Sequence, residues 1–169
     1  MNFELVPITD NDLTQYKTIL QEAFQKGFEN IFGKTEETIL PDKDIEISLH
    51  TKGAVAYKAI VDGKMVGGAI VCFDKKNQHT HLDFLFVKHD IHNKGIGKAI
   101  WFELERLYTN TRVWETCTPY FDKRNIHFYV NVCGFHIVEF FNEKHLMPDA
   151  PEDFIGDANE GMFKFIKQL

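Results

Sequence analysis

The sequence predicts an α/β fold with a mixed, mostly antiparallel central sheet of about seven strands and helices on both faces. Several segments alternate apolar and polar residues with a period of two, which is typical of half-buried strands. Other segments repeat apolar residues every three to four positions, as amphipathic helices do. One strand–helix–strand unit lies in the middle of the chain, and such a crossover is right-handed and leaves its two strands parallel. The hairpins that flank it are antiparallel, so the sheet must be mixed.

The N-terminal part contains one strand and two helical segments. Alternation over Phe3–Ile8 predicts a strand, and the polar run Thr9–Asp12 supplies N-cap side chains for a helix. The helix is expected over Leu13–Phe28, where apolar residues recur at helical spacing. A second, weaker helical stretch covers Glu36–Leu49 and is interrupted by Pro41, so its boundaries stay open.

A three-stranded meander follows. The strands Ala54–Val61 and Met65–Phe73 are joined at Asp62-Gly63-Lys64, and Asp-Gly between two such runs is a strong hairpin signal. After the polar turn Asp74–Gln78, the third strand covers His79–Val87.

The second half of the chain alternates helices and strands. A polar loop leads into Gly95-Ile96-Gly97 and a helix that continues through Tyr108. A strand is expected over Arg112–Thr118 and a short helix over Asn125–Val132, which Gly134 ends because glycine suits the left-handed position after a helix.

The last two strands enclose an acidic loop. They are expected over Phe135–Phe141 and Met162–Lys167, with Asn142–Gly161 between them. An acidic rim attracts cationic amines, but a solvated loop without substrate contact explains the same charges. The loop holds one cation, Lys144, and six acidic residues: Glu143, Asp149, Glu152, Asp153, Asp157 and Glu160.

Length and charge limit the classes of protein. A chain of 169 residues forms one domain, residues 1–169. The net charge of −6 disfavours a nucleic-acid binder, which needs a basic surface. The apolar runs are too short to span a bilayer, and Met1–Glu4 lacks the basic and apolar regions of a secretory signal. We therefore expect a cytoplasmic protein with no nucleic-acid or membrane partner.

Neither the cysteines nor the histidines predict a metal site. Cys72, Cys117 and Cys133 are odd in number and form no CxxC pair, so they are expected to be small buried hydrophobes in a reducing cytoplasm. Histidine pairs on a strand or loop can chelate zinc, but no cysteine or carboxylate cluster with ligand spacing accompanies them. The pairs are His79 with His81, and His89 with His92.

The glycine turn before the third helical segment carries the chemistry. Unpaired N–H groups at a helix start attract anions, and glycine lets a diphosphate approach the backbone closely. A Walker loop would need Gly at His92 and Ser or Thr at Ala99, and a dinucleotide fingerprint would need Gly at Ile100. Both patterns fail at the turn formed by Gly95 and Gly97.

A third phosphate-binding pattern does match. The acetyl-CoA turn of GNAT-type N-acetyltransferases commonly reads Gln/Arg-x-x-Gly-x-Gly/Ala after an apolar strand end, and Val87, Gly95 and Gly97 agree with it. His92 replaces the usual Gln or Arg, which alters one side-chain contact. The family's next helix is also similar to a segment of this chain, with matches at Asn125, Phe128, Tyr129, Gly134 and Phe135. The sequence therefore resembles the GNAT (GCN5-related) N-acetyltransferase family over residues 1–169.

The resemblance implies a sheet that is splayed in the middle and that holds acetyl-CoA as co-substrate. Backbone near Phe86 and Val87 would pair with the pantetheine, main-chain amides of the turn would hold the diphosphate, and Lys94 and Lys98 would add positive charge. The implied cofactor-binding residues are Phe86, Val87, His92, Asn93, Lys94, Gly95, Ile96, Gly97, Lys98 and Asn125.

Direct acetyl transfer to an amine requires a base for the amine proton and a donor for the leaving thiolate. Tyr129 matches the family tyrosine that donates a proton or a hydrogen bond to the leaving thiolate, although core packing on its helix explains this residue too. His81 lies where some relatives carry a catalytic glutamate, Glu115 on the neighbouring strand is a second candidate, and a water chain is a third. An exposed or structurally bonded strand histidine also explains His81.

The expected activity is acetyl-CoA-dependent N-acetylation of a primary amine of a small molecule or peptide. The alternative is a non-catalytic CoA-binding or protein-interaction module on the same fold. Aromatic side chains that could line an acceptor cleft, or belong to the core, are Phe24, Phe28, Phe32, Tyr120 and Phe121. The sequence identifies neither the acceptor nor the oligomeric state, so a homodimer stays open.

Overall fold

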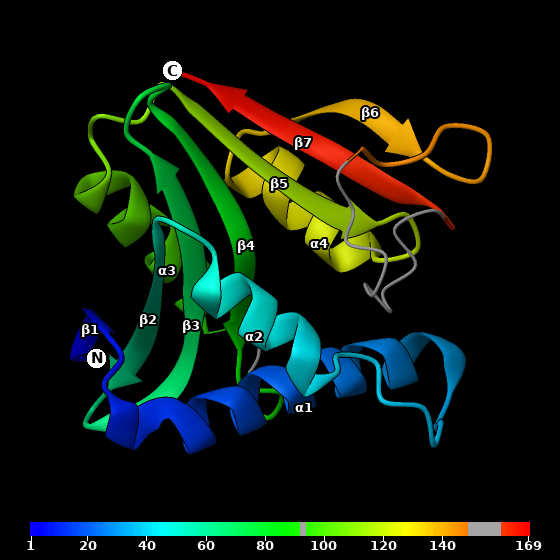
Figure 1. Cartoon of the computed structure of the whole chain (residues 1–169). Helices are drawn as coiled ribbons and strands as arrows, with labels where there is room; N and C mark the ends of the chain where they lie inside the picture. The colour runs from blue at the N-terminus through cyan, green and yellow to red at the C-terminus, as the bar shows by residue number, and fades with distance from the viewer. Residues whose placement is uncertain (92–93, 149–159) are drawn as a thin grey trace. The chain divides into compact units, whose positions relative to one another are not determined.

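A computed structural model describes residues 1–91, 94–148 and 160–169. Seven strands hydrogen-bond in the order β1-β2-β3-β4-β5-β7-β6, and the sheet is mixed, with helices on both sides (Figure 1). This confirms the predicted fold class. The strands are β1 (Phe3–Pro7), β2 (Ala54–Val61), β3 (Lys64–Asp74), β4 (His79–Val87), β5 (Val113–Pro119), β6 (His136–Phe141) and β7 (Met162–Gln168). The helices are η1 (Asp10–Asp12), α1 (Leu13–Phe32), α2 (Asp42–His50), α3 (Ile96–Leu107), α4 (Lys123–His127) and η2 (Phe128–Val132).

The chain forms two compact units. Unit 1 comprises Met1–Cys72 and Asp83–Thr109, and unit 2 comprises Phe73–Leu82 and Asn110–Leu169. No helix in the described ranges is both long enough and apolar enough to cross a membrane.

In unit 1, helices cover both faces of the strands. Figure 1 shows α1 and α2 on one face of β2 and β3, and α3 on the other. The apolar stripe of α1, which includes Tyr16 and Leu20, packs with Ile45 of α2, Ile70 of β3 and Phe86 of β4. On the other face, α3 buries four side chains, namely Ile96, Ile100, Trp101 and Leu104. Burial of these apolar side chains supplies the main favourable free energy of the unit.

Two glycines of β3 allow β4 to approach unusually closely. A Cβ on Gly67 would lie 2.3 Å from the carbonyl oxygen of Phe86, and one on Gly68 would lie 2.8 Å from the ring of Tyr16. The main chain of Lys88 donates to the carbonyl of Val66 at 2.7 Å, which fixes the end of β4 beside this glycine pair. The glycine pair therefore sets the backbone position of the strand end that precedes the turn.

We predict opposite effects for two Gly→Ala substitutions. Gly67→Ala should lower the free energy of unfolding by about 2 kcal/mol, because its methyl group overlaps rigid backbone of β4. Gly27→Ala should raise it by about 0.5–1 kcal/mol, because Gly27 lies inside α1 with no atom within 4 Å of the added Cβ. Urea unfolding of both variants measures the difference, and equal shifts would contradict the tight packing of β3 on β4.

In unit 2, β7 lies between β5 and β6 and is antiparallel to both. The first residues of β4 pair in parallel with β5, His79 opposite Val113 and His81 opposite Glu115, as predicted for the crossover. Trp114, Thr116 and Thr118 alternate on the buried face of β5, which α4 and η2 cover (Figure 1). The opposite face of β5 carries Glu115 and Cys117.

Three local predictions need correction, and one boundary that the sequence left open is now fixed. The first helix runs on to Phe32 through Gly27, because its end is fixed by Gly33 at φ +89° and by contacts to the following loop. The second helix begins only at Asp42, directly after Pro41. The short fourth helix changes at Phe128 into a π-type turn, in which the N–H of Cys133 donates to the carbonyl of Phe128 five residues back.

The third correction concerns the cysteines. Only Cys133 is buried, whereas Cys72 and Cys117 are partly exposed. None of the three, all in the described part of the chain, forms a disulfide.

Candidate functional site

The start of α3 in unit 1 has the backbone geometry of an anion site. Gly95 is the N-cap residue and adopts a left-handed conformation at φ +72°, and no heavy atom lies within 4 Å of a Cβ built on it. Since the N-cap has no side chain, no side-chain hydrogen bond closes the helix start. The main-chain N–H groups of Ile96, Gly97 and Lys98 belong to the first turn, which an α-helix leaves without helical partners.

Positive charge and exposure accompany these amides. Lys94, Gly95 and Lys98 are exposed, and the Lys98 ammonium lies 5.6 Å from the centre of the Phe102 ring. The positive end of the helix dipole points the same way. An open, cation-flanked cradle of main-chain donors is what a diphosphate requires, so the residues present fit the predicted ligand. Two predicted contact residues, His92 and Asn93, lie outside the described residues.

The strand that leads to the turn presents backbone rather than side chains. The ring of Phe86 is buried and meets the ring of Tyr16 edge-on at 5.2 Å, so it belongs to the core. Val87 is partly buried. At both positions a ligand would therefore have to use main-chain groups, as the resemblance implies for the pantetheine.

Tyr129 lies in unit 2 and is buried in an aromatic cluster. Its ring contacts those of Phe128, Phe135 and Phe165 at centroid distances of 5.5, 5.7 and 5.6 Å, and only 5% of the residue is exposed. Burial raises the pKa of Tyr129 well above its ordinary value, and the nearby Cys133 adds to the effect. The phenol is therefore neutral throughout the physiological range.

Thr116 lies near the Tyr129 hydroxyl, and this interaction lowers the pKa of the phenol against the larger effect of burial. The hydroxyl of Thr116 donates its proton to the carbonyl of Leu82 at 2.8 Å. Tyr129 is thus a buried, neutral phenol beside the hydroxyl of Thr116.

Asn125 is fixed at the start of α4 in the same unit. Its main-chain N–H donates to Asp122, the N-cap residue, at 3.0 Å, and its side-chain amide donates to the hydroxyl of Thr118 at 3.4 Å. Burial raises the pKa of Asp122. The described contacts of Asn125 are therefore structural ones at the helix start.

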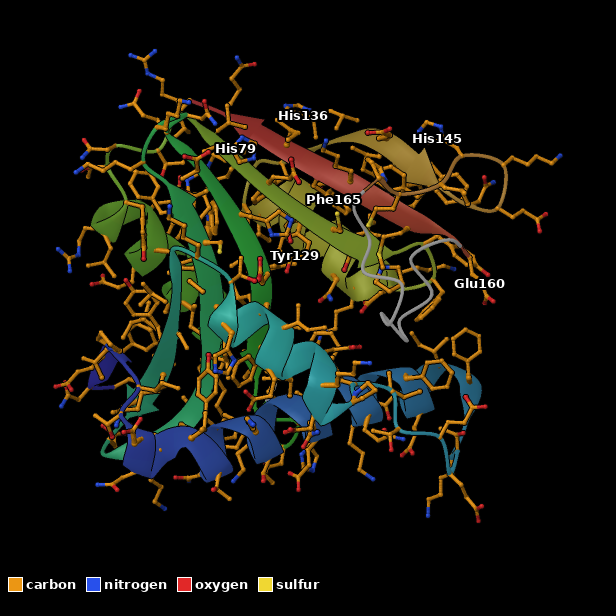
Figure 2. The ribbon with its side chains drawn as sticks, in the orientation of Figure 1. His79, Tyr129, His136, His145, Glu160 and Phe165 are labelled. Atoms are coloured by element: carbon orange, nitrogen blue, oxygen red, sulfur yellow. The ribbon has the colours of Figure 1, made fainter. Side chains whose placement is uncertain are left out.

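The two candidate bases, His81 and Glu115, lie side by side. Nε2 of His81 is 3.5 Å from one carboxylate oxygen of Glu115, and Nε2 of His79 is 3.4 Å from the other. Lys164 of β7 lies 3.5 Å from Glu115 and 3.8 Å from Glu139. These side chains are one-fifth to one-third exposed. They lie on the face of the sheet opposite to Tyr129, as the positions of His79 and Tyr129 in Figure 2 illustrate.

The sequence predicted His81 and Glu115 as candidate bases but not their pairing or the link to Lys164. The two-residue spacing of His79 and His81 was readable, whereas the parallel register that sets His81 opposite Glu115 was not. Over the described ranges, no group of three or more His, Cys, Asp or Glu side chains is arranged to hold a metal ion.

The predicted residues divide between the units. Unit 1 contains Phe86, Val87 and the turn at 94–98, and unit 2 contains Asn125, Tyr129, His81 and Glu115. Among the predicted cleft aromatics, Phe24 packs edge-on against Phe84 at 5.7 Å.

Comparisons with known proteins agree with this architecture. The chain is 42% identical over 164 residues to the uncharacterized protein YrkN of Bacillus subtilis (strain 168), covering 94% of this chain and 89% of that one. Its fold is similar to the ribosomal-protein-S18-alanine N-acetyltransferase of Escherichia coli, with a TM-score of 0.72, 14% identity and coverage of 99% and 94%.

A GNAT family acetyltransferase from Elizabethkingia anophelis, solved with acetyl-CoA bound, gives a TM-score of 0.71 at 16% identity and covers 99% of each chain. The sequence model of the acetyltransferase (GNAT) family matches residues 17–135, a range that includes the glycine turn, Asn125 and Tyr129. With most of the chain matched, this protein belongs to the acetyltransferase (GNAT) family.

Proposed function

We propose that this chain is an acetyl-CoA-dependent N-acetyltransferase that transfers the acetyl group directly to a primary amine of a small molecule or peptide. The observation that carries the proposal is the start of α3, where Gly95 leaves main-chain donors open to an anion. Family membership supports acetyl transfer, and the related fold from Elizabethkingia anophelis holds acetyl-CoA. We further propose that residues 1–169 act as one catalytic domain.

Main-chain and side-chain groups of unit 1 would bind acetyl-CoA. Acetyl-CoA would supply the activated acetyl thioester. The amides of Ile96, Gly97 and Lys98 would hold its diphosphate, with Lys94 and Lys98 adding charge. Main-chain groups at Phe86 and Val87 would pair with the extended pantetheine as an added strand does.

We infer that His81 accepts the proton of the attacking amine. Glu115 lies within 3.5 Å of Lys164 and of both imidazoles, and a neutral imidazole has a ring nitrogen that can accept a proton. The carboxylate of Glu115 would then stabilise the imidazolium that forms. Glu115 is in this scheme a positioning residue.

Tyr129 would donate a hydrogen bond to the leaving thiolate. The hydroxyl proton of the phenol would be directed toward the leaving sulfur. Since the pKa of the phenol lies above that of an ordinary thiol, hydrogen bonding to the thiolate is favoured over complete proton transfer.

Two measurements on the full chain test the function. Isothermal titration should detect acetyl-CoA binding, and a thiol-release assay over a panel of primary amines should detect turnover. Binding without turnover would favour a non-catalytic CoA-binding module, and absence of binding would contradict both functions.

We also propose a cytoplasmic location, supported by three cysteines that form no disulfide.

A further inference from the structure

A pocket in unit 2 combines aromatic walls with a carboxylate rim. Its lining residues within the described ranges are Tyr120, Phe140, Asn142, Glu143 and Glu160. Figure 2 shows Glu160 beside the start of β7. None of these residues has a role in the function proposed above.

The local backbone holds the first aromatic wall in place. Tyr120 follows β5 directly, and its main-chain N–H donates to the carbonyl of Gly161 at 2.9 Å. Gly161 has φ +125°, and a Cβ there would lie 2.4 Å from the Tyr120 ring. A glycine is therefore required for the ring to lie against this backbone.

The second wall and the turn beside it are also supported. Phe140 packs on Phe163 at 5.1 Å. The side-chain oxygen of Asn142 accepts from the main-chain N–H groups of Lys144 and His145 at 3.0 and 3.1 Å, which fixes the turn that carries Glu143. Even so, 53% of Tyr120 and 42% of Phe140 remain exposed, so both rings are available to a ligand.

The rim carboxylates differ from the other acidic groups nearby. Glu139 is paired with His145 at 2.6 Å and with Lys164 at 3.8 Å. Within the described part of the chain, neither Glu143 nor Glu160 has an ion-pair partner. Two carboxylates beside two exposed aromatic rings are the groups that recognise an organic ammonium ion, through charge and cation–π attraction.

The pocket lies on the same sheet face as Tyr129. Phe140 is the cross-strand partner of Phe163, and Phe163 and Phe165 lie on one side of β7. Phe165 in turn contacts Tyr129 at 5.6 Å. A continuous row of rings thus joins the pocket wall to Tyr129 within unit 2.

We propose that this pocket binds the second, protonated cationic group of a diamine or polyamine acceptor. Carboxylates and aromatic faces stabilise the ammonium form, whereas the amine that attacks the thioester must be neutral. The pocket therefore suits a distal cation and not the reacting nitrogen. This inference rests on the proposed N-acetyltransferase function and names its substrate class.

The test compares amines that differ in one charge. A series of α,ω-diamines of increasing length is paired with monoamines of the same chain, and kcat/KM is measured with acetyl-CoA. For the best diamine length, kcat/KM should exceed that of the matched monoamine by about tenfold or more. In the double variant Glu143→Gln, Glu160→Gln, kcat/KM for the diamine should fall to that for the monoamine. The kcat/KM for the monoamine and the KM for acetyl-CoA should stay unchanged.

A control and a binding measurement complete the test. The variant Glu4→Gln, Glu36→Gln removes two charges from exposed positions in unit 1 and should keep the ratio, which excludes a general effect of net charge. Titration of diamine and monoamine into the protein without acetyl-CoA should show tighter, Glu143- and Glu160-dependent binding of the diamine.

The outcomes separate the two proposals. Turnover with equal kcat/KM for both amines, or a ratio that survives the double variant, would overturn the polyamine site and leave the acetyltransferase function standing. Carboxylate-dependent diamine binding without turnover of any amine would support the site and count against the acetyltransferase. Equal binding of diamine and monoamine would overturn the site whatever the turnover.

Discussion

Replacing Gly95 with glutamate should weaken acetyl-CoA binding by about a hundredfold, because a carboxylate would stand where the diphosphate is expected. No heavy atom lies within 4 Å of the added Cβ, so the side chain itself meets no clash. The left-handed conformation at φ +72° costs a non-glycine residue about 1–2 kcal/mol of folding free energy. Isothermal titration measures the affinity and urea unfolding measures the stability.

The matched control for this substitution is Gly95→Ala. Alanine imposes the same backbone strain without the charge, so both variants should lose similar stability. Only the glutamate should lose most of its affinity. If the two variants bound acetyl-CoA equally well, the diphosphate would have to lie elsewhere.

Replacing Tyr129 with phenylalanine should lower kcat by about 10–1000-fold while changing acetyl-CoA affinity less than threefold, since the lost hydroxyl acts on the leaving thiolate. The ring contacts with Phe128, Phe135 and Phe165 are retained, so the core stays filled. Pre-steady-state thiol release separates the chemical step from binding.

Tyr16→Phe is the matched control for Tyr129→Phe. Tyr16 is another fully buried tyrosine, and its hydroxyl donates to the carbonyl of Ala69 at 3.1 Å. Both variants lose one buried hydroxyl group and should lose about 1 kcal/mol of stability. An unchanged kcat in Tyr129→Phe, or an equal loss in Tyr16→Phe, would reduce Tyr129 to a packing role.

The sequence pattern predicted most of the fold because period and turn chemistry are local. The alternation over Ala54–Val61 and the Asp62-Gly63 turn predicted the hairpin of β2 and β3 to within a residue. The same logic located the parallel pairing of β4 and β5. The start of α3 was predictable because glycine in a left-handed N-cap leaves a direct sequence signal.

Other features depend on tertiary contacts that no short window contains. The π-type turn at Phe128 places Tyr129 among rings from β7 and from the loop after η2. Gly67 looked like an ordinary strand residue, and its role appears only against the backbone of Phe86. The ion pairs of Glu115 required the register of β4, β5 and β7 together.

The aromatic pocket is an intermediate case. In the sequence, Tyr120 was one of five candidates for cleft or core aromatics, and the acidic loop was explained either as a rim for cationic amines or as a solvated loop, whereas Phe140 was not singled out. Phe140 joins them only through its pairing with Phe163 across β6 and β7. Asp149, Glu152, Asp153 and Asp157 lie outside the described residues.

The most direct test of the central claim is a backbone amide NMR titration of the full chain with acetyl-CoA and, separately, with acetyl-pantetheine, which lacks the diphosphate. If main-chain donors at the start of α3 bind the diphosphate, the amide resonances of Ile96, Gly97 and Lys98 will shift strongly with acetyl-CoA and little with acetyl-pantetheine. Equal shifts with both compounds, or acetyl-CoA binding that leaves these three amides unmoved, would contradict the claim.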